Sequence, residues 1–421
     1  MRRRFELRIG AITRPAGSDR PSLEVGVKVL QPGHPPINAA TSAIVSSGIR
    51  VVADRAAALR RAGREVFPFH LGEPDFDTPE AIKAATVEAL RSGPARYPPT
   101  AGIPPLREAI ASHLNSRYAY PVTPDDVIVT VGACEALTLA LFVALAPGDE
   151  VLVPTPCWPN YLQTPRLFGA TVRTIPQDPS TGFRIEPRQL LEAIGPSTRA
   201  VLLNQPSNPT GRVMERQDIA MLVDGLRERG VWLIADEIYH DLVYAPHWTS
   251  VLDVVREGAP IFYVNGFSKS YAMTGWRLGY VVTSGSARDA VLKVHQALVT
   301  SVAPFTQVGA AHAFNQFEFV AAMREALDRR RARTIAAIHE MGLECTDPDG
   351  AFYVFPTIPD WAGDATEFTL HALEAAGVAI VPGDAFGSDH ADRFRLSFAC
   401  DDATLERGLA ALARVVSSGP P

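Results

Sequence analysis

A lysine just beyond an expected strand is the first candidate for chemistry in this chain. The segment VNGFSKSYAMTGWRLGY, residues 264–280, runs from a short apolar strand into a polar turn with Ser268 and Lys269, and Arg277 follows. In parallel α/β sheets, ligands bind beyond the carboxyl ends of the strands. Lysine amines form Schiff bases with carbonyl compounds. Taken alone, however, Lys269 is better explained as a solvated loop residue, because loop lysines are common.

Two further segments place polar side chains after strands. NQPSNPTGRV, residues 204–213, contains Asn208, and IADEIYHDLVY, residues 234–244, contains Asp236 and Tyr239. A carboxylate can hold a protonated ring nitrogen, and a phenol can reach a ring oxygen. Singly, Asp236 fits a helix cap or salt bridge, Tyr239 a packing residue, and Asn208 an Asn-Pro turn. Because all three follow successive strands of one sheet, a shared ligand site is the better interpretation.

Seven segments form an ordered series along the chain: LGEPDFDTP, RYPPTAGIPPLREAI, VTVGACEAL, PSNPTG, DEIYHDLVY, NGFSKSYAMTGWRLGY and FRLSFA. Together they resemble the class I/II aminotransferases, pyridoxal-phosphate enzymes of fold type I, and most closely the bacterial aspartate-aminotransferase-like branch. The resemblance covers roughly residues 45–416 and leaves out residues 1–40. SNPTG alone would be weak evidence, whereas seven ordered segments are specific.

The resemblance implies a role for each matching residue around pyridoxal phosphate. Lys269 is similar to the lysine that binds the cofactor covalently and moves the substrate proton. Asp236 resembles the carboxylate that keeps the ring nitrogen protonated, so that the ring accepts electrons. Tyr239 and Asn208 resemble the pair that hydrogen-bonds the ring 3-oxygen. Trp158 matches the aromatic residue that stacks on the ring, with a core tryptophan as the alternative.

The resemblance also implies a phosphate site. VGACEAL runs from a strand into a helix, so Ala133 and Cys134 can offer backbone N–H groups at the helix N-terminus. Ser268 and Arg277 would complete the site. Tyr97 resembles the residue that reaches the phosphate of the neighbouring subunit, which implies a homodimer with shared active sites.

Arg395, in RFRLSFA, resembles the arginine that binds the substrate α-carboxylate. A guanidinium suits this role because it forms two parallel hydrogen bonds to a carboxylate. Gly72 matches a position whose backbone N–H meets the same carboxylate, and Asn208 is a further contact. The implied reaction moves an amino group from an L-amino acid to a 2-oxo acid by a ping-pong mechanism, with the cofactor alternating between pyridoxal and pyridoxamine phosphate.

The identity of the donor is less defined. Relatives that act on aspartate often place a lysine where this chain has Cys134, or use an arginine of the neighbouring subunit in the stretch after the large domain. Residues 294–323 contain no Lys or Arg, although Arg50 is a candidate replacement. A neutral or aromatic donor is therefore weakly favoured over aspartate.

Other reactions remain open at this stage, because a fold does not fix a reaction. C–S β-lyases, decarboxylases and synthases use the same fold and lysine, and a β-lyase is the main alternative. A non-catalytic regulatory domain normally adds a DNA-binding module, for which residues 1–40 are too short and irregular.

A sheet must bring these residues together. Apolar runs predict seven strands with helices between several of them, which favours an α/β fold with a mostly parallel sheet covered by helices. The expected strands are residues 127–131, 150–153, 170–174, 200–203, 231–235, 261–265 and 278–283, with a separate short strand over 66–71. Helices are expected over residues 51–62, 80–91, 134–145 and 215–229.

After about residue 293 the pattern changes to a long helical region up to residue 341, followed by short apolar runs and a final helix. This predicts a smaller α+β domain. The expected division is an N-terminal extension over 1–40, a segment packing with the small domain over 41–70, a large cofactor-binding domain over 71–305 and a small domain over 306–421.

Composition excludes some functions. The 421 residues are 47% hydrophobic and 20% charged, as in globular proteins. The formal charge of −6 gives no sign of a basic surface that would bind nucleic acid or a membrane. The longest apolar stretch, residues 136–146, is too short to span a bilayer, and no signal peptide is recognised. Four cysteines without a CxxC pair indicate a reducing cytoplasm and no metal site.

Overall fold

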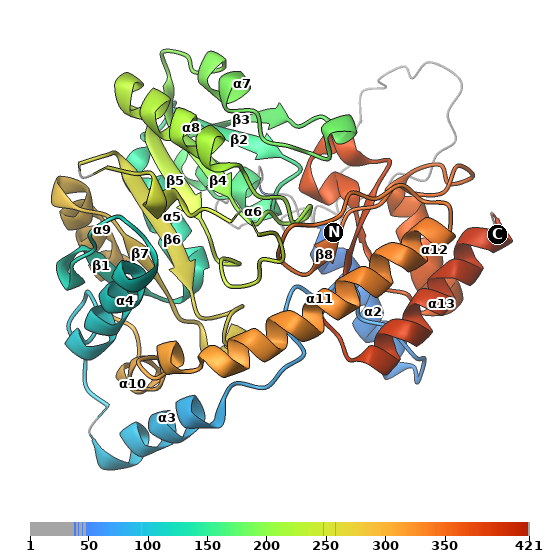
Figure 1. The fold of residues 1–421 in the computed structure, drawn as a ribbon, viewed down its shortest axis with the longest axis horizontal. Helices are drawn as coiled ribbons and strands as arrows, with labels where there is room; N and C mark the ends of the chain where they lie inside the picture. Colours follow the sequence, from blue (N-terminus) through green and yellow to red (C-terminus); the bar gives the residue numbers. More distant parts are fainter. Residues whose placement is uncertain are drawn as a thin grey trace, which may run out of the picture. The chain divides into compact units, whose positions relative to one another are not determined.

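The computed structural model describes residues 38, 41, 44, 48–93, 95–246, 248–256 and 258–419. Except for Asn38, the predicted N-terminal extension over residues 1–40 lies outside them. Within the described residues, seven strands form one sheet in the order β1-β7-β6-β5-β4-β2-β3 (Figure 1). They are β1 (Val127–Thr130), β2 (Glu150–Thr155), β3 (Thr171–Pro176), β4 (Thr198–Asn204), β5 (Trp232–Asp236), β6 (Ile261–Gly266) and β7 (Gly279–Val282).

The sheet is mostly parallel, as the sequence predicts. β2 pairs parallel with β3 and β4, and the pairs β4–β5 and β5–β6 are also parallel. β7 is antiparallel to both β6 and β1. The α/β class with a mostly parallel seven-stranded sheet is therefore confirmed.

Both faces of this sheet are buried. Along β4, Ala200 and Leu202 pack into one hydrophobic core, while Val201 and Leu203 pack into another on the opposite face. Because neighbouring side chains of a strand point to opposite faces, a strand covered on both sides needs a continuous apolar run. This explains why the sequence shows unbroken apolar segments rather than alternation.

Helices supply the two covers (Figure 1). α5 (Gly132–Ala144) and α9 (Gly285–Leu298) pack into one core, and α4 (Pro104–Arg117) and α8 (Arg216–Arg229) into the other. The remaining helices of this region are α3 (Glu80–Ser92), α6 (Pro159–Gln163), α7 (Pro187–Glu192) and α10 (Pro304–Ala310).

A second, three-stranded sheet has the order β8-β10-β9 and lies in the last part of the chain. Its strands are β8 (Tyr353–Val354), β9 (Val381–Pro382) and β10 (Phe394–Ser397), and the helices beside it are α11 (Phe317–Glu340), α12 (Ala365–Ala376) and α13 (Asp402–Ser418). α2 (Gly48–Arg61) packs against β9. The boundaries at residues 70 and 305 remain our proposal.

Three local expectations were wrong. Residues 66–71 form no strand, only an isolated bridge from Phe67 to Val378. The helix expected from residue 134 begins at Gly132, because Gly132 adopts a positive φ of 75° that turns the chain sharply out of β1. The helical region expected up to residue 341 is broken between α9, α10 and α11, where Pro304 begins a new helix.

The sheet register gathers the candidate residues. Asn204, the last residue of β4, lies opposite Asp236, the last residue of β5, and Asp236 lies opposite Val264 of β6. β6 ends at Gly266, three residues before Lys269. The carboxyl ends of three neighbouring strands thus meet at one edge, where such folds bind ligands. None of the described helices is long and apolar enough to cross a membrane.

Close contact between β7 and α5 should make Gly279 essential for stability. A Cβ at this position would lie 2.5 Å from the backbone carbon of Gly132 and against the backbone nitrogen of Ala133, and backbone cannot yield as a flexible side chain can. Gly279→Ala should therefore lower the free energy of unfolding by about 1–3 kcal/mol. Gly275→Ala, which meets nothing within 4 Å, should stay within about 0.5 kcal/mol of the parent. Denaturant unfolding of the two variants checks this, and equal stabilities would contradict it.

Candidate active site

A cavity of about 350 Å³ lies at this strand-end edge. Its walls contain eleven of the twelve residues singled out from the sequence. These are Gly72, Ala133, Cys134, Trp158, Asn208, Asp236, Tyr239, Ser268, Lys269, Arg277 and Arg395. Residues that are distant in the sequence thus converge on one space large enough for a small-molecule ligand.

Tyr97 is the twelfth residue, and it does not line this cavity. Its side chain is 86% exposed in the single chain. The sequence interpretation assigned Tyr97 to the site of a neighbouring subunit, so its exposure here is compatible with that assignment.

Asp236 is a buried carboxylate with fixed partners. One oxygen accepts a hydrogen bond from the Tyr161 hydroxyl at 2.8 Å, and the other accepts from the backbone N–H of Ile238 at 3.1 Å. Burial raises the pKa of Asp236 to about 6, although these two hydrogen bonds lower it in part. A cation beside this carboxylate would offset the cost of keeping it charged.

Lys269 faces the cavity as an amine with weakened basicity. Its Nζ donates to the carbonyl oxygen of Gly72 at 2.6 Å. Burial lowers the pKa of Lys269 to about 8, with the nearby Glu73 opposing the shift. The lowered pKa increases the fraction of free amine near neutral pH, and only the free amine attacks a carbonyl.

Arg395 is a fully buried guanidinium that is only partly satisfied. Its Nη1 donates to Asn208 Oδ1 at 3.1 Å and its Nη2 donates to the carbonyl oxygen of His70 at 2.7 Å. The Nε has no hydrogen-bond partner among the described residues. The rings of Tyr353 and Phe386 flank the guanidinium at 4.5 and 5.0 Å from its Cζ. A buried guanidinium with an unused N–H donor is suited to bind a carboxylate ligand.

The N-terminus of α5 contributes to the wall of the cavity. Ala133 and Cys134 lie in its first turn, where backbone N–H groups lack helical partners. Arg277 closes this end so tightly that a Cβ on Gly132 would lie 2.6 Å from Arg277 Nη2. Free N–H groups, the helix dipole and a guanidinium together favour an anion such as a phosphate.

Four further residues of the cavity wall are not indicated by any motif of the sequence: Ile49, Tyr161, Ile238 and Tyr353. The position of Tyr161 one helical turn after Trp158 could have revealed it, because both would then point from the start of one short helix. Tyr353 stands in the apolar run GAFYVFP, residues 350–356, where its hydroxyl gives no sign that it differs from a packing residue.

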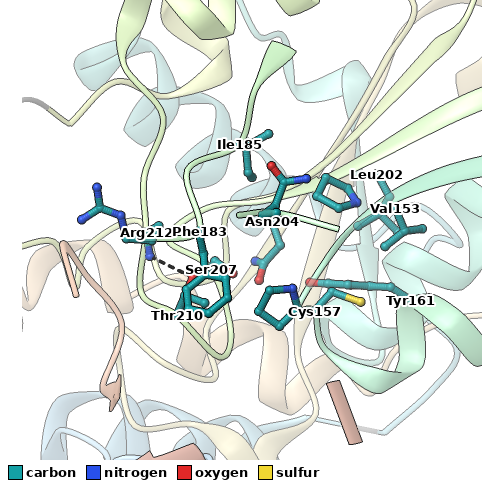
Figure 2. A pocket seen from close by; sticks show the side chains of 13 residues that line it. Val153, Cys157, Tyr161, Phe183, Ile185, Leu202, Asn204, Ser207, Thr210 and Arg212 are labelled. Atoms are coloured by element: carbon teal, nitrogen blue, oxygen red, sulfur yellow. Dashed lines mark hydrogen bonds between the residues drawn. The ribbon is translucent and has the colours of Figure 1, made fainter. Parts of the chain in front are cut away.

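Figure 2 shows a second and much smaller cavity of about 20 Å³, lined by Cys157, Tyr161, Asn204 and Arg212 among others. It shares Tyr161 with the larger cavity. Its volume is enough for about one water molecule, so it is no substrate site.

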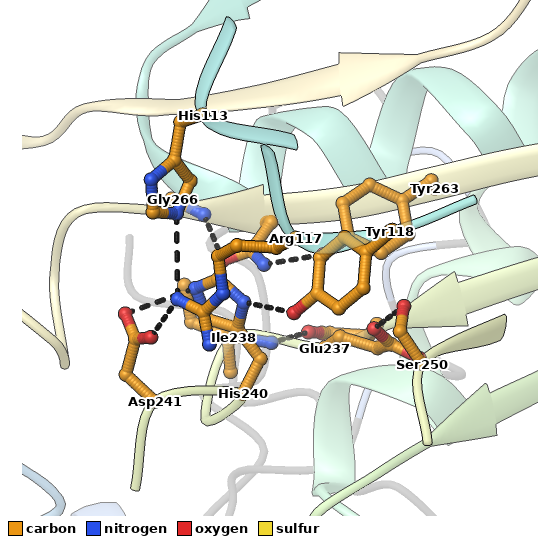
Figure 3. A network of polar contacts seen from close by, with 12 residues as sticks. His113, Arg117, Tyr118, Glu237, Ile238, His240, Asp241, Ser250, Tyr263 and Gly266 are labelled. Carbon is orange, nitrogen blue, oxygen red and sulfur yellow. Dashed lines mark hydrogen bonds and ion pairs between the residues drawn. The ribbon is translucent and has the colours of Figure 1, made fainter. Parts of the chain in front are cut away.

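A buried polar network holds the turn that carries Asp236 and Tyr239 (Figure 3). Asp241 is ion-paired with Arg117 at the end of α4 and lies 3.1 Å from His240 Nε2. Although burial would raise it, the pKa of Asp241 is held well below its usual range by His240 and Arg117. The hydroxyl of Tyr118 contacts His240 Nδ1 at 2.9 Å. The turn is thereby tied to α4, which packs on the face of the sheet opposite to α5.

The donor set fits pyridoxal phosphate. An aldehyde requires an amine, which Lys269 provides, and a ring nitrogen requires a buried carboxylate, which Asp236 provides. The phosphate requires free N–H groups and a cation, which the start of α5 and Arg277 provide. Trp158, Tyr239 and Ser268 line the space between these groups.

Comparison with known proteins agrees with this geometry. The family model of aminotransferase class I and II matches residues 64–412. A probable aspartate/prephenate aminotransferase of Aquifex aeolicus is 38% identical over 84% of this chain and 92% of its own length. A probable N-acetyl-LL-diaminopimelate aminotransferase of Bacillus subtilis is 36% identical over 82% and 88%. The solved aspartate aminotransferase of Thermus thermophilus with maleate has a TM-score of 0.87 at 36% identity and covers 91% of this chain and 100% of that one.

The chain therefore belongs to the class I and II aminotransferases. It is a pyridoxal-phosphate-dependent aminotransferase of fold type I, as the sequence resemblance implied. The alternative of a C–S β-lyase is not supported.

The lowered pKa of Lys269 predicts how the cofactor attaches to the protein. The attachment rate of pyridoxal phosphate to cofactor-free protein should rise about tenfold per pH unit up to about pH 8 and then level off, because only the free amine reacts. The chain has four lysines, Lys28, Lys83, Lys269 and Lys293, so borohydride reduction followed by mass spectrometry can assign the label.

In this experiment the label should appear on Lys269 and disappear in Lys269→Ala. Lys83→Ala is the matched control, since Lys83 lies at the surface in an ion pair with Asp77. A label on another lysine, or a rate that is constant between pH 6 and 8, would contradict the assignment.

Proposed function

We propose that this aminotransferase moves an amino group from a neutral or aromatic L-amino acid to a 2-oxo acid in two half-reactions of a ping-pong mechanism. One observation carries the proposal. The cavity joins Lys269, Asp236 and Arg395, and the only basic side chains among its described lining residues are Lys269, Arg277 and Arg395.

Arg395 is proposed to bind the α-carboxylate of every substrate. It enters the cavity already aligned by Asn208 and His70, so little conformational freedom is lost when the carboxylate arrives. Gly72 adds its backbone N–H on the same side. These contacts orient the substrate so that its Cα–H bond points toward Lys269.

Lys269 is proposed as the group that removes and returns the Cα proton. When bound, pyridoxal phosphate supplies an aldehyde that takes up the amine and a ring that accepts electrons from Cα. Asp236 maintains the positive charge of the ring nitrogen, and Tyr239 and Asn208 donate toward the ring 3-oxygen. Trp158 stacks on the ring, as the resemblance implied.

The phosphate is proposed to bind Ala133, Cys134, Ser268 and Arg277. Tyr97 would reach the phosphate of a second subunit, which makes the protein a homodimer with shared sites. The side chain of Tyr97 is 86% exposed in the single chain, so it is accessible to a second subunit. A cytoplasmic location is proposed from the four free cysteines.

The proposed donor preference follows from the positions of the cationic side chains relative to the cavity. Arg50, the candidate for a second carboxylate, has a 79% exposed side chain and lies 3.7 Å from Asp54 on α2, whereas its neighbour Ile49 lines the cavity. Cys134 occupies the position of a possible lysine, and burial raises the pKa of its thiol, which keeps it neutral. The described lining residues therefore contain no further cation for the second carboxylate of aspartate.

The role of Asp236 can be separated from its neighbour Glu237, another buried carboxylate that faces away from the cavity. Glu237 accepts hydrogen bonds from Ser250, Val251 and Gln205 (Figure 3 labels Glu237 and Ser250). Asp236→Asn should lower kcat/KM by about 100-fold or more, corresponding to roughly 3 kcal/mol. Glu237→Gln also replaces a buried carboxyl by an amide but should cost less than about tenfold. Equal losses of kcat/KM in the two variants, or a retained turnover in Asp236→Asn, would contradict the role assigned to Asp236.

The donor preference is tested by single-turnover loss of the visible cofactor absorbance with a panel of amino acids. Phenylalanine or another neutral donor should react faster than aspartate, because a buried unpaired carboxylate costs several kcal/mol. Cys134→Lys should raise the rate for aspartate relative to phenylalanine by about tenfold or more, and the matched Cys134→Ser should not. A faster reaction of aspartate than of every neutral donor in the parent protein would refute the preference.

A further inference from the structure

Tyr161 is a buried residue of the cavity wall that takes no part in the steps proposed above. It lies on α6, the short helix that follows β2, and it is 2% exposed. A buried hydroxyl needs a hydrogen-bond partner inside the protein. A backbone carbonyl would satisfy a hydroxyl that only packs in the core, whereas Tyr161 donates to a carboxylate of the site.

The hydroxyl and the ring of Tyr161 contact two different groups of the site. The Oη donates a hydrogen bond to Asp236 Oδ2 at 2.8 Å. The ring meets the ring of Trp158 edge to face, with 5.4 Å between the centroids and an interplanar angle of 86°. Asp236 is the proposed partner of the ring nitrogen of the cofactor, and Trp158 is the proposed stacking partner of that ring. One side chain therefore supports both contacts.

The direction of the hydrogen bond between Tyr161 and Asp236 is fixed by their protonation. Burial, together with the nearby Asp236, raises the pKa of Tyr161 well above its usual range, so the phenol keeps its proton. An ionised carboxylate has no proton to donate, and the phenol is therefore the donor. Burial raises the pKa of Asp236 to about 6, and the hydrogen bond from Tyr161 opposes that rise. Tyr161 thus favours the charged form of Asp236.

The same contacts orient the carboxylate. Tyr161 binds Oδ2 of Asp236 from α6, and the backbone N–H of Ile238 binds Oδ1 at 3.1 Å from the turn after β5. A carboxylate offers about two acceptor positions on each oxygen. Because one position on each oxygen is filled, rotation of the carboxylate is restricted, and acceptor positions remain for a donor that enters the cavity.

We propose that Tyr161 is a positioning residue of the cofactor site. Its hydroxyl holds the Asp236 carboxylate charged and oriented toward the ring nitrogen, and its ring holds Trp158 in the stacking position. This inference rests on the roles proposed above for Asp236 and Trp158.

The consequence concerns the proton between Asp236 and the ring nitrogen. That proton stays on the nitrogen when the carboxylate is the weaker base, and a hydrogen-bond donor to a carboxylate makes it a weaker base. Loss of the Tyr161 hydroxyl should therefore make Asp236 easier to neutralise. A ligand whose ring has no basic nitrogen should then bind with a smaller penalty.

The experiment measures the dissociation constants of two probes for the full chain freed of cofactor, at one neutral pH. The probes are pyridoxamine phosphate and its analogue with a CH group in place of the ring nitrogen. Neither has an aldehyde, so neither forms a bond with Lys269. The parent should bind pyridoxamine phosphate more tightly by about tenfold or more, because the analogue leaves the buried carboxylate without a counter-charge. Tyr161→Phe should bind the analogue about threefold to tenfold more tightly than the parent does, while its affinity for pyridoxamine phosphate changes by less than about threefold.

Further variants separate the hydroxyl from the ring. Asp236→Asn should lose most of the preference for pyridoxamine phosphate, and adding Tyr161→Phe to it should change the ratio of the two dissociation constants no further. Tyr271→Phe removes the hydroxyl of a buried phenol outside the cavity and should keep the ratio of the parent. Tyr161→Leu also removes the ring and should bind both probes about threefold or more weakly than Tyr161→Phe, because Trp158 loses its edge contact.

The outcomes distinguish this inference from the proposed function. If the parent binds the two probes equally, the proposed role of Asp236 fails and the inference fails with it. If the parent discriminates and Tyr161→Phe discriminates to the same extent, the role of the hydroxyl alone is overturned. Equal affinities of Tyr161→Leu and Tyr161→Phe for both probes would overturn the support of Trp158 by the ring. Tighter binding of the analogue to Tyr161→Phe supports the role of the hydroxyl, because a loss of packing would weaken both probes.

Discussion

The site depends on how the charge of the buried Asp236 carboxylate is stabilised. Burial disfavours its charge, and the hydrogen bonds from Tyr161 and the backbone of Ile238 recover only part of that cost, because its pKa still rises to about 6. A cationic ring nitrogen next to it would offset the remainder. If Asp236 meets the ring nitrogen as proposed, its charge would be stabilised fully only with the cofactor in place, and cofactor binding would depend on the electrostatics of this strand end.

The sheet makes this arrangement possible. Parallel pairing of β4, β5 and β6 brings their carboxyl ends to one edge, so residues separated by about thirty positions in the sequence become neighbours. On the other side of the turn, the ion pair of Arg117 with Asp241 holds that edge against α4. The antiparallel strand β7 returns along β6 and places Arg277 beside the start of α5.

How much of this could be predicted depends on the kind of signal. The strands and Lys269, Asp236 and Arg395 were accessible, because apolar runs and strand-end motifs are local features. The absence of a strand over residues 66–71 could not be predicted. This segment forms only a single bridge, from Phe67 to Val378, but the burial of Phe67 and Phe69 requires the same apolar run that a strand would show. Tyr353 could not be identified from the sequence for a related reason. Whether a phenol in an apolar strand only packs in the core or also lines a site depends on its contacts with distant segments.

The cavity also limits the charge of its ligands. If Arg277 meets the phosphate, Arg395 the α-carboxylate and Asp236 the ring nitrogen, each fixed charge of the lining has one counter-charge, and Lys269 is consumed in its bond to the cofactor. A second carboxylate would then enter a site whose described lining has no cation left and whose Cys134 and Ile49 are neutral. Desolvation of that charge would oppose binding. Under the proposed assignments, specificity would therefore follow from the number of buried charges as much as from the shape of the cavity.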